Sequence, residues 1–240
     1  MATLLLRLAA PLQSWGTDSK FEIRNTAREP SKSGVIGLLA AALGRERDAD
    51  LEDLKRLRFG VRVDQEGELL HDYHIASIRG YGPPVERIKQ YDKKPFITHR
   101  YYLSDAIFLV GLESEDRDFL SMLENAIRKP VFSLFLGRRS CPPSMPILIG
   151  IRDEDLLTSL QKENWLAAEW QRERILKKGG TLRILLDSQE EQQGAKIKDS
   201  PISFDPRNRR FQYRNTIMKN IDLGSIKPNV TEHDAMKELR

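Results

Sequence analysis

The first turn of one predicted helix carries residue types that bind an anion. Ser31, Lys32 and Ser33 open the segment 30–44, in which nearly every later side chain is small or aliphatic. Hydroxyls, an ammonium group and the free backbone N–H groups of a helix start suit a phosphate. An ordinary core helix, capped by Ser31 or Ser33 and ended by Gly44 in the left-handed conformation, explains the same residues. This stretch alone favours the capped helix.

Two adjacent arginines offer a second anion contact. Arg138 and Arg139 follow Gly137 at the end of an apolar run and precede two consecutive prolines. Neighbouring guanidinium groups are hard to bury, and the prolines hold the chain extended, so we expect both side chains to point outward. A guanidinium fork fits phosphate oxygens and also stacks on bases. Phosphate contact is therefore favoured over a structural ion pair with a carboxylate.

The turn after the first predicted strand contains Gln13 and Trp15. An exposed indole ring can stack on a nucleic-acid base, which stabilises binding by about 1–3 kcal/mol per base. A tryptophan can equally anchor a loop by burying its ring while its N–H finds an acceptor. Taken alone, the turn favours the anchor.

The segment 77–100 differs in composition from the rest of the chain. Its six basic and two acidic side chains give it a net charge of +4, equal to the formal excess of the whole protein. Glycines, prolines and tyrosines are interleaved with these charges and aliphatic residues are few, so the segment cannot form a core. We expect an excursion that follows a phosphate backbone and stacks on bases, with a merely solvated loop as the alternative.

Residues for acid–base chemistry on RNA are also present. Such chemistry needs one group that removes the proton of a 2′-hydroxyl and another that protonates the leaving oxygen. These types gather late in the basic segment and just after it, at His99, Lys93, Lys94, Tyr101 and Tyr102. No adjacent Lys-His pair occurs there.

The sequence gives no reason to expect a metal or another cofactor. His71 and His74 are three residues apart in a predicted strand, so they point to opposite faces and do not suit one metal ion. The four histidines and one cysteine show no recognisable ligand spacing. No glycine-rich phosphate loop precedes Lys32, so ATP binding is not supported.

Apolar periodicity predicts the elements that must position these side chains. Helices are expected at 30–44, 50–57 and 114–129, and strands at 4–10, 59–63, 68–76, 101–112 and 131–136. The turn at Glu66 and Gly67 predicts a hairpin between 59–63 and 68–76. Strand, helix, strand, strand, helix, strand is the order of the ferredoxin-like split βαβ unit, so the predicted class is α+β.

The sequence of the last 90 residues supports fewer predictions. A helix is expected at 153–178, where Trp165 and Trp170 more often indicate packing than a ligand site, and a strand at 181–186. The segment 202–213 alternates apolar and basic residues. Four arginines in this segment or directly after it are expected on its exposed side, where they could meet RNA or an acidic neighbour: Arg207, Arg209, Arg210 and Arg214. Residues from 227 onward hold little that is apolar and are expected to form a flexible tail, ordered only by a partner.

Composition sets the outer bounds. The 240 residues, 40% of them hydrophobic, are enough for one large domain or two small ones. The net charge of +4 suits a polyanionic partner without requiring one. A single cysteine excludes an intrachain disulfide and favours a reducing compartment. With no signal peptide and no apolar run of membrane-spanning length, we expect a soluble, cytoplasmic protein without membrane contact.

Four ordered motifs resemble a known family. The strings PLQSWG, PSKSGVIGLLAAALG, DYH and LGRRSCPP, within residues 3–150, resemble the CasD family of the type I-E CRISPR Cascade, the fifth family of Cas proteins in the RAMP superfamily. Beyond them, SPISFDPRNRRFQYR echoes the same family. The resemblance implies a ferredoxin-like, RRM-like RAMP palm at 1–150 with a protruding basic thumb at 77–100. Residues 151–240 are expected to form a helical insert, a β-rich region and the tail.

The resemblance also implies a function. We expect from it a non-catalytic RNA-binding subunit that caps the 5′ handle of CRISPR RNA in antiviral defence. The implied partners are the CRISPR RNA, the Cascade backbone subunits, the large subunit and, indirectly through the complex, target DNA. The residues implied to lie at the RNA are Gln13, Trp15, Arg24, Ser31, Lys32, Ser33, Lys89, Tyr91, Lys93, Lys94, Arg100, Arg138 and Arg139.

Two other functions stay open on the sequence. In a related subtype, I-C, the family member cuts the repeat RNA without a metal, using a tyrosine, a lysine and a histidine, and His99 with its neighbours offers those types. A metal-independent repeat endoribonuclease is therefore the alternative. A free-standing RNA-binding module of general specificity is the third.

Overall fold

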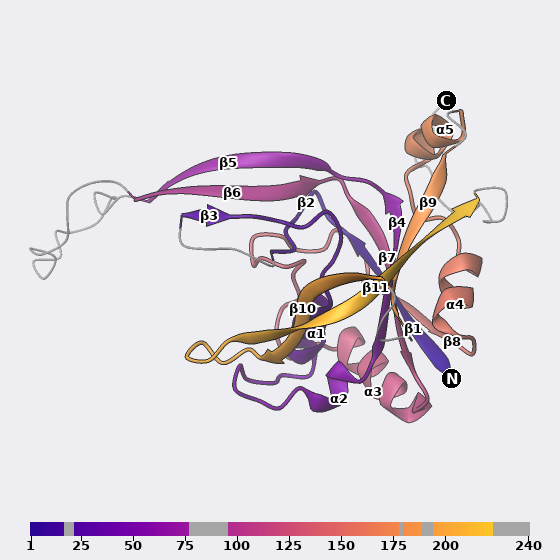
Figure 1. Cartoon of the computed structure of the whole chain (residues 1–240), viewed down its shortest axis with the longest axis horizontal. Helices are drawn as coiled ribbons and strands as arrows, with labels where there is room; N and C mark the ends of the chain where they lie inside the picture. Colours follow the sequence, from indigo (N-terminus) through magenta and orange to yellow (C-terminus); the bar gives the residue numbers. More distant parts are fainter. Residues whose placement is uncertain (17–21, 77–95, 178–179, 189–193, 223–240) are drawn as a thin grey trace, which may run out of the picture.

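The computed structural model describes residues 1–16, 22–76, 96–177, 180–188 and 194–222. Its main sheet has seven strands, all paired antiparallel, in the order β10-β11-β9-β4-β7-β1-β8. The strands are β1 (Ala2–Ala9), β4 (Arg58–Gln65), β7 (Ile107–Ser114), β8 (Leu148–Arg152), β9 (Thr181–Asp187), β10 (Ala195–Ser203) and β11 (Arg210–Asp222). The predicted α+β class is confirmed as a mostly antiparallel sheet with helices on its faces (Figure 1).

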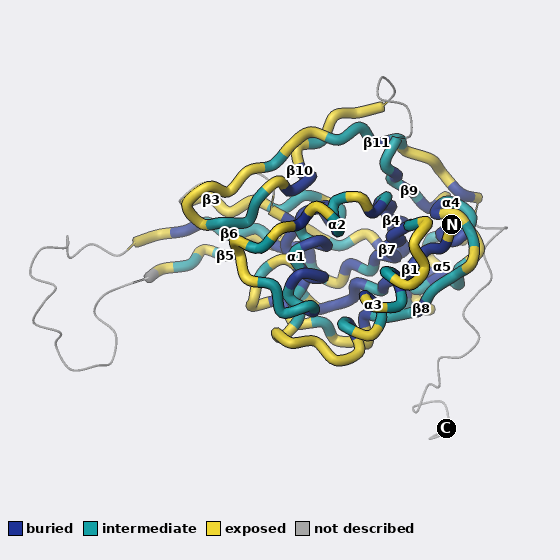
Figure 2. The backbone as a smooth tube through the Cα atoms, turned by 90° about the horizontal axis from the view of Figure 1, so that it is seen from below, coloured by how far each residue is buried: buried dark blue, intermediate teal, exposed yellow. Residues whose placement is uncertain are grey.

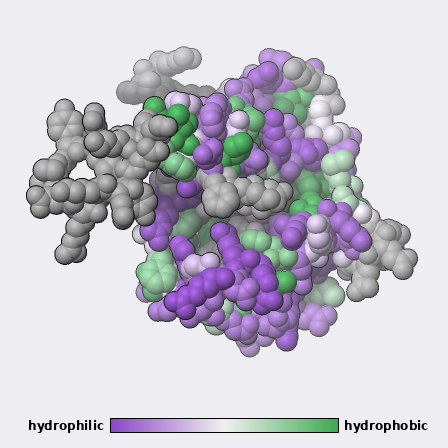
Figure 3. Space-filling view, turned by 60° about the vertical axis from the view of Figure 1, so that its left-hand side comes forward, coloured by the Kyte–Doolittle hydropathy of each residue, from purple (hydrophilic) through white to green (hydrophobic). Residues whose placement is uncertain are grey.

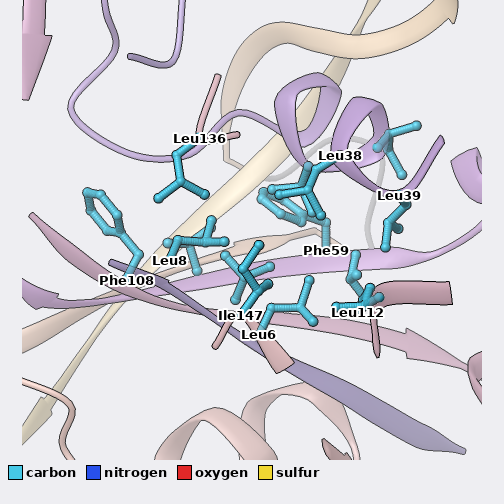
Figure 4. Close-up of a cluster of buried hydrophobic side chains, with 14 of the residues drawn as sticks. Leu6, Leu8, Leu38, Leu39, Phe59, Phe108, Leu112, Leu136 and Ile147 are labelled. Atoms are coloured by element: carbon cyan, nitrogen blue, oxygen red, sulfur yellow. The ribbon is translucent and has the colours of Figure 1, made fainter. Parts of the chain in front are cut away.

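Successive side chains of each strand point to opposite faces of this sheet, so the hydrophobic core is divided into one cluster on each face. On β1, Leu6 and Leu8 pack with Leu38 of a helix on one face, whereas Leu5 belongs to a separate cluster on the other. Figure 4 shows the first of these clusters, and Figure 2 shows buried backbone concentrated where helices meet the sheet. The first face carries α1 (Lys32–Ala42), α2 (Glu52–Lys55) and α3 (Arg117–Arg128). The second face carries α4 (Leu156–Lys162), and α5 (Glu169–Lys177) follows it.

Helix α1 has the expected caps at both ends. The Ser31 Oγ accepts a hydrogen bond from the Gly34 N–H at 3.2 Å, and Gly44 takes the left-handed conformation with φ 73°. Between these caps the helix is buried on most sides, as its small and aliphatic residues predict. The expectation of a capped core helix is therefore confirmed.

A second, smaller sheet forms an arm that extends from the main sheet. It contains β2 (Leu12–Gln13), β3 (Ile23–Arg24), β5 (Glu68–Ala76) and β6 (Phe96–Ser104), and the pair β5–β6 is its long part (Figure 1). β4 pairs with β7, and β5 pairs with β6. The continuous chain segment β4–β5 therefore runs antiparallel to the segment β6–β7. Together they form one two-stranded ribbon that bends where it passes from the main sheet into the arm. The hairpin expected between 59–63 and 68–76 is therefore wrong.

Three residues fix the bend of this ribbon. The Gln65 side-chain amide donates to the Asp105 carbonyl at 2.6 Å, and Asp105 has a positive φ of 55°. At Gly67 a Cβ would stand 2.7 Å from the Ser104 carbonyl oxygen, too close for any larger residue without a shift. The bend also divides the strand expected at 101–112 into β6 and β7, which belong to different sheets.

The strand expected at 131–136 is absent from that position. The Val131 and Phe132 N–H groups donate to the Ala42 and Ala41 carbonyls at 3.0 and 3.2 Å, so this segment caps the end of α1 instead of pairing in the sheet. The fourth strand of the expected βαββαβ order is β8, further along the chain. Periodicity cannot separate an apolar connector from a strand when both are short.

The C-terminal strands extend the same sheet. β9 pairs with β4 and β11 pairs with β9, so the sheet continues across the expected domain boundary, and residue 150 itself lies inside β8. The helix expected at 153–178 is two helices, with Trp165 buried between them and Trp170 exposed. The expected tail from 227 lies outside the described residues. Among those described, no helix is long and apolar enough to cross a membrane.

A candidate nucleic-acid interface at the base of the arm

Trp15 is a buried anchor on which three of the sequence motifs meet. Its side chain is 1% exposed, so the ring offers no face for base stacking, and that expectation is corrected in favour of the anchor. A Cβ at Gly34, in the first turn of α1, would lie 2.8 Å from the indole ring, and one at Gly137 would lie 3.6 Å from it. Gly34 therefore lets its backbone approach Trp15, whereas Gly137, with φ 85°, lets its backbone approach the Ser14 carbonyl oxygen, which a Cβ would overlap. The loop that carries the paired arginines is held against α1 through this ring.

Gln13 is a structural partner of Trp15. Its side-chain oxygen accepts from the Trp15 indole N–H at 3.1 Å, and its side-chain nitrogen donates to the Leu8 and Ala106 carbonyls at 3.2 and 2.7 Å. Gln13 is fully buried, and this amide is occupied within the protein. The expectation that Gln13 contacts RNA is corrected: the residue fixes the turn.

The first turn of α1 does hold an anion, but the anion is a carboxylate of the same chain. The Lys32 N–H donates to the Asp199 carboxylate at 2.8 Å, and the Lys32 ammonium group pairs with Asp187 at 2.8 Å. Arg214 joins both carboxylates, at 2.7 Å from Asp187 and 2.5 Å from Asp199. The expected phosphate contact at this turn is therefore corrected, because Lys32 is already paired.

The same network corrects two further expectations. Ser31 and Ser33 are buried, with Ser31 acting as the helix cap, so their hydroxyls face the protein. Arg214, expected on an exposed side, is only 11% exposed and pairs with Asp187 and Asp199, and its guanidinium lies 5.1 Å from the centre of the Phe59 ring. Desolvation lowers the pKa of Arg214, but the two carboxylates outweigh it and raise that pKa overall. We call Lys32, Asp187, Asp199 and Arg214 the clasp.

Other predicted arginines come together at the base of the arm. β3 pairs with β6 in parallel, with Arg24 opposite Arg100. Arg138 reaches this pair, donating from Nη2 to the Arg24 carbonyl at 2.7 Å. Arg139 is exposed beside it. We call Arg24, Arg100, Arg138 and Arg139 the arm-base cluster.

Arg138 is held in one orientation. Its guanidinium lies 4.7 Å from the centre of the Tyr102 ring, a cation–π distance. The loop beneath it is closed by hydrogen bonds from the Cys141 N–H to the Arg138 carbonyl at 2.9 Å and from the Leu136 N–H to the Cys141 carbonyl at 2.8 Å. The Arg138 Nη1 is buried without a hydrogen-bond partner among the described residues.

No carboxylate neutralises the arm-base cluster within the part of the chain that the structure describes. Asp72 stands opposite Arg100 in the register of β5 and β6, yet no ion pair joins them, and the Arg100 Nε donates to the Thr98 hydroxyl at 3.2 Å. Four guanidinium groups from three segments therefore share one surface without an anion. A bound phosphate backbone would reduce the repulsion between these positive charges.

Sequence reasoning named His71, His99 and Tyr101 separately but missed that their rings lie together along one side of the arm. The His71 Nε2 and the His99 Nδ1 are 2.9 Å apart, and the His71 ring stacks on Tyr101 with centres 4.8 Å apart. Tyr73, 53% exposed, meets the edge of the His99 ring. The period-two placement of these residues on two facing strands is the signal that could have found them.

The remaining predicted residues give three outcomes. Lys89, Tyr91, Lys93 and Lys94 lie outside the described residues. Cys141 is buried, and burial raises the pKa of its thiol, so it stays protonated at neutral pH. Among the described residues no group of three or more His, Cys, Asp or Glu side chains is placed to hold a metal ion.

Comparisons with known proteins find CRISPR-associated proteins. Residues 3–217 match the model of the family described as "CRISPR-associated protein (Cas_Cas5)". The chain is 38% identical over 160 residues to the "CRISPR system Cascade subunit CasD" of Escherichia coli strain K12, which covers 61% of this chain and 70% of that protein.

Two solved structures extend the likeness to nearly the whole fold. One, titled "Crystal structure of Cas protein", is 38% identical with a TM-score of 0.71 and covers 95% of this chain and 98% of its own. The other, titled "CRISPR RNA-guided surveillance complex", is 31% identical with a TM-score of 0.76 and covers 99% of this chain and 97% of its own.

Proposed function

The chain belongs to the Cas5 family of CRISPR-associated proteins, and from that premise we propose that it is a subunit of a Cascade-type surveillance complex that binds and caps the 5′ handle of CRISPR RNA. The observation that carries the RNA-binding part is the arm-base cluster, whose four arginines meet no carboxylate among the described residues. Arginine suits this role because its planar fork can contact phosphate oxygens in pairs and lie flat against a base.

The fold supports the proposal at the level of topology. We infer that β4-β7-β1-β8, with α1 after β1 and α3 after β7, is the ferredoxin-like palm of this family, because a split βαβ unit has this connectivity. The arm is then the thumb, with its described part beginning at Glu68 rather than at residue 77. On this reading, the cluster lies where the thumb leaves the palm, and a strand of RNA can contact both.

At the arm base, buried residues fix the backbone and the arginines are left to contact RNA. Trp15 and Gln13 hold the turn, while Ser31 caps α1, so these buried residues fix the backbone that carries the arginines. Arg138 is stacked on Tyr102, which fixes the orientation of its guanidinium. A pre-oriented guanidinium loses less conformational entropy on binding than a free one. The handle has a fixed sequence, so we expect some base contacts beside those to phosphates.

Protein partners are part of the proposal. The arm exposes aliphatic side chains that cannot serve as stacking platforms, among them Leu69 at 48% and Ile75 at 53%. Such a surface suits the backbone subunits or the large subunit of the complex. Target DNA would then be met indirectly, through the assembled particle.

We further propose that this subunit does not cut RNA. His99 shares a hydrogen bond with His71, and Tyr102 is 6% exposed beneath Arg138, so neither is free to act on a 2′-hydroxyl in this arrangement. The repeat endoribonuclease remains the second candidate. The close approach of His71 to His99 is the specific observation in its favour, because two imidazoles can serve as base and acid.

One experiment separates these functions. End-labelled repeat RNA, with its handle intact or scrambled, is incubated with the protein in EDTA, and both binding and cleavage are followed. We expect intact RNA, preference for the native handle, and binding weakened roughly tenfold or more by Arg24→Ala/Arg138→Ala, since each charge-assisted contact is worth about 1.5–3 kcal/mol. Arg128→Ala, on the exposed end of α3, is the control for lost charge and should leave handle binding unchanged.

Two results would decide against the cap. A discrete RNA product that disappears in His99→Ala would make the protein the processing enzyme. Equal binding of the native and scrambled handles would support the general RNA-binding module instead.

A further inference from the structure

The connection between β10 and β11 carries a basic string that handle binding does not use. Arg207, Arg209 and Arg210 follow the end of β10 at Ser203, and all three side chains are exposed. The ion pairs that join this hairpin to carboxylates are those of Arg214. None is made by the three exposed arginines within the described residues. The string is therefore an unneutralised group of cations at the hairpin tip.

A fourth exposed arginine comes from a distant segment of the chain. Arg47 lies in the connector after α1 and is exposed. Burial, followed by the charge of Arg47, lowers the pKa of Arg209 from its ordinary value, which means that the two guanidinium groups stand within electrostatic reach of each other. Two like charges held together cost free energy that a bound anion would offset.

Aromatic packing fixes the position of Arg209. Its guanidinium carbon lies 5.2 Å from the centre of the Phe211 ring, and that ring contacts Phe204 with centres 6.5 Å apart. Phe204 in turn packs toward α1, where a Cβ at Gly37 would lie 3.8 Å from its ring. The tip therefore rests on the first face of the palm and presents Arg209 in one orientation.

The neighbouring carboxylates do not cancel this charge. The Asp205 carboxylate accepts the Arg207 backbone N–H at 2.8 Å, which uses it to shape the turn. Glu46 and Asp48 flank Arg47 in sequence, but no ion pair joins either of them to an arginine in the described parts of the chain.

We propose that Arg47, Arg207, Arg209 and Arg210 form a second binding site, the hairpin-tip site, for the phosphodiester backbone of a nucleic acid. All four cations are arginines, whose forks match paired phosphate oxygens better than an ammonium group does. The hairpin and the arm extend to the same side of the molecule (Figure 1), and Figure 3 shows this side as mostly hydrophilic. RNA and duplex DNA share this backbone chemistry, so the test must distinguish them.

The test measures the salt dependence of binding for two probes, repeat RNA with its handle and a duplex DNA of unrelated sequence. The variant is Arg207→Ala/Arg209→Ala/Arg210→Ala. Its control is Lys129→Ala/Lys177→Ala/Lys219→Ala, which removes three exposed positive charges elsewhere. Each lost phosphate contact lowers the slope of log affinity against log salt by about 0.7 for a single strand and about 0.9 for duplex DNA.

We expect the tip variant to lower the slope by about 2 or more for one of the two probes, with affinity falling about 10- to 100-fold near 0.1 M salt, while the control falls less. A change for RNA alone identifies CRISPR RNA as the source of the phosphates, and a change for duplex alone identifies DNA. Arg47→Ala should produce part of the same change. Circular dichroism of each variant confirms that the hairpin still folds.

The proposal is overturned if the tip variant matches the control with both probes, in which case the arginines are a solvated surface or meet an acidic protein. It does not depend on handle recognition. Loss of handle preference in Arg24→Ala/Arg138→Ala with no change in the tip variant would leave the proposed function standing and reject the second site. A slope change on duplex DNA without any handle preference would support the second site and reject the proposed function.

Discussion

Individual residues show what sequence reasoning can and cannot identify. At the α1 start, Lys32 and its backbone N–H bind carboxylates of the same chain, where the sequence offered a phosphate site as the alternative to an ordinary capped helix. The identity of the anion was not accessible, because Asp187 and Asp199 lie more than 150 residues away along the chain. Both arginines at 138 and 139 were expected outside; Arg139 is exposed, whereas Arg138 is half-buried against Tyr102 with its Nη1 buried. Trp15 was misassigned once the resemblance was added, although its residue type alone favoured the anchor.

The clasp leads to a prediction about stability. Asp199→Asn keeps the shape of the side chain but leaves Arg214 and the helix start with half of their partner charge. We expect the free energy of unfolding to fall by about 3–5 kcal/mol, because breaking a buried pair leaves an uncompensated charge. Urea unfolding followed by fluorescence measures this change.

The matched control for the clasp is an exposed pair. Glu124→Gln removes the partner of Arg128 on the surface of α3, and such pairs are worth about 0–1 kcal/mol. If Asp199→Asn costs no more than this control, the clasp does not hold the C-terminal hairpin to α1.

At the scale of elements, the main helices were predictable and strand pairing was not. Periodicity and capping residues predicted α1 and α3, because a helix is determined by nearby residues. The ribbon that bends between β4 and β5 was read as a simple hairpin. The local pattern at Glu66 and Gly67 is that of a turn, and only the register of β6 and β7 reveals a bend.

The bend can be tested at Gly67. A Cβ there would stand 2.7 Å from the Ser104 carbonyl oxygen and 2.8 Å from the Ala106 Cβ. Gly67→Ala is therefore expected to lower stability by about 1–3 kcal/mol and to speed hydrogen exchange at the junction amides of β5 and β6. Glu66→Ala, which loses an exposed contact to Arg183, should leave the exchange nearly unchanged. Equal exchange in the two variants would show that the junction tolerates the methyl group.

At the scale of the whole molecule, the C-terminal third completes the core. Leu5 and Leu109 belong to a cluster that also includes Leu156 and Leu160 of α4 and Ile184 of β9. Sequence reasoning divided the chain at residue 150 because the four ordered motifs of the family resemblance lie before that position. It could not show that this face needs a cover, since burial on both faces of a strand depends on elements that come later.

A truncation tests whether the first 152 residues fold alone. A chain ending at residue 152 would expose the face that carries Leu5 and Leu109, and we expect it to lack a cooperative unfolding transition and to bind a hydrophobic dye. Calorimetry of the fragment beside the full chain measures this. A sharp transition in the fragment would instead establish residues 1–150 as an independent domain.

The bent ribbon has a mechanical consequence. The strands that continue into the arm, β4 and β7, lie inside the seven-stranded sheet and not at its edge. Tension that an assembly applies to the arm therefore acts on the hydrogen bonds that flank β4 and β7 on both sides. These bonds are loaded together, in shear. An edge strand, in contrast, could be peeled from the sheet one hydrogen bond at a time. The arm is rooted in the part of the fold that yields last.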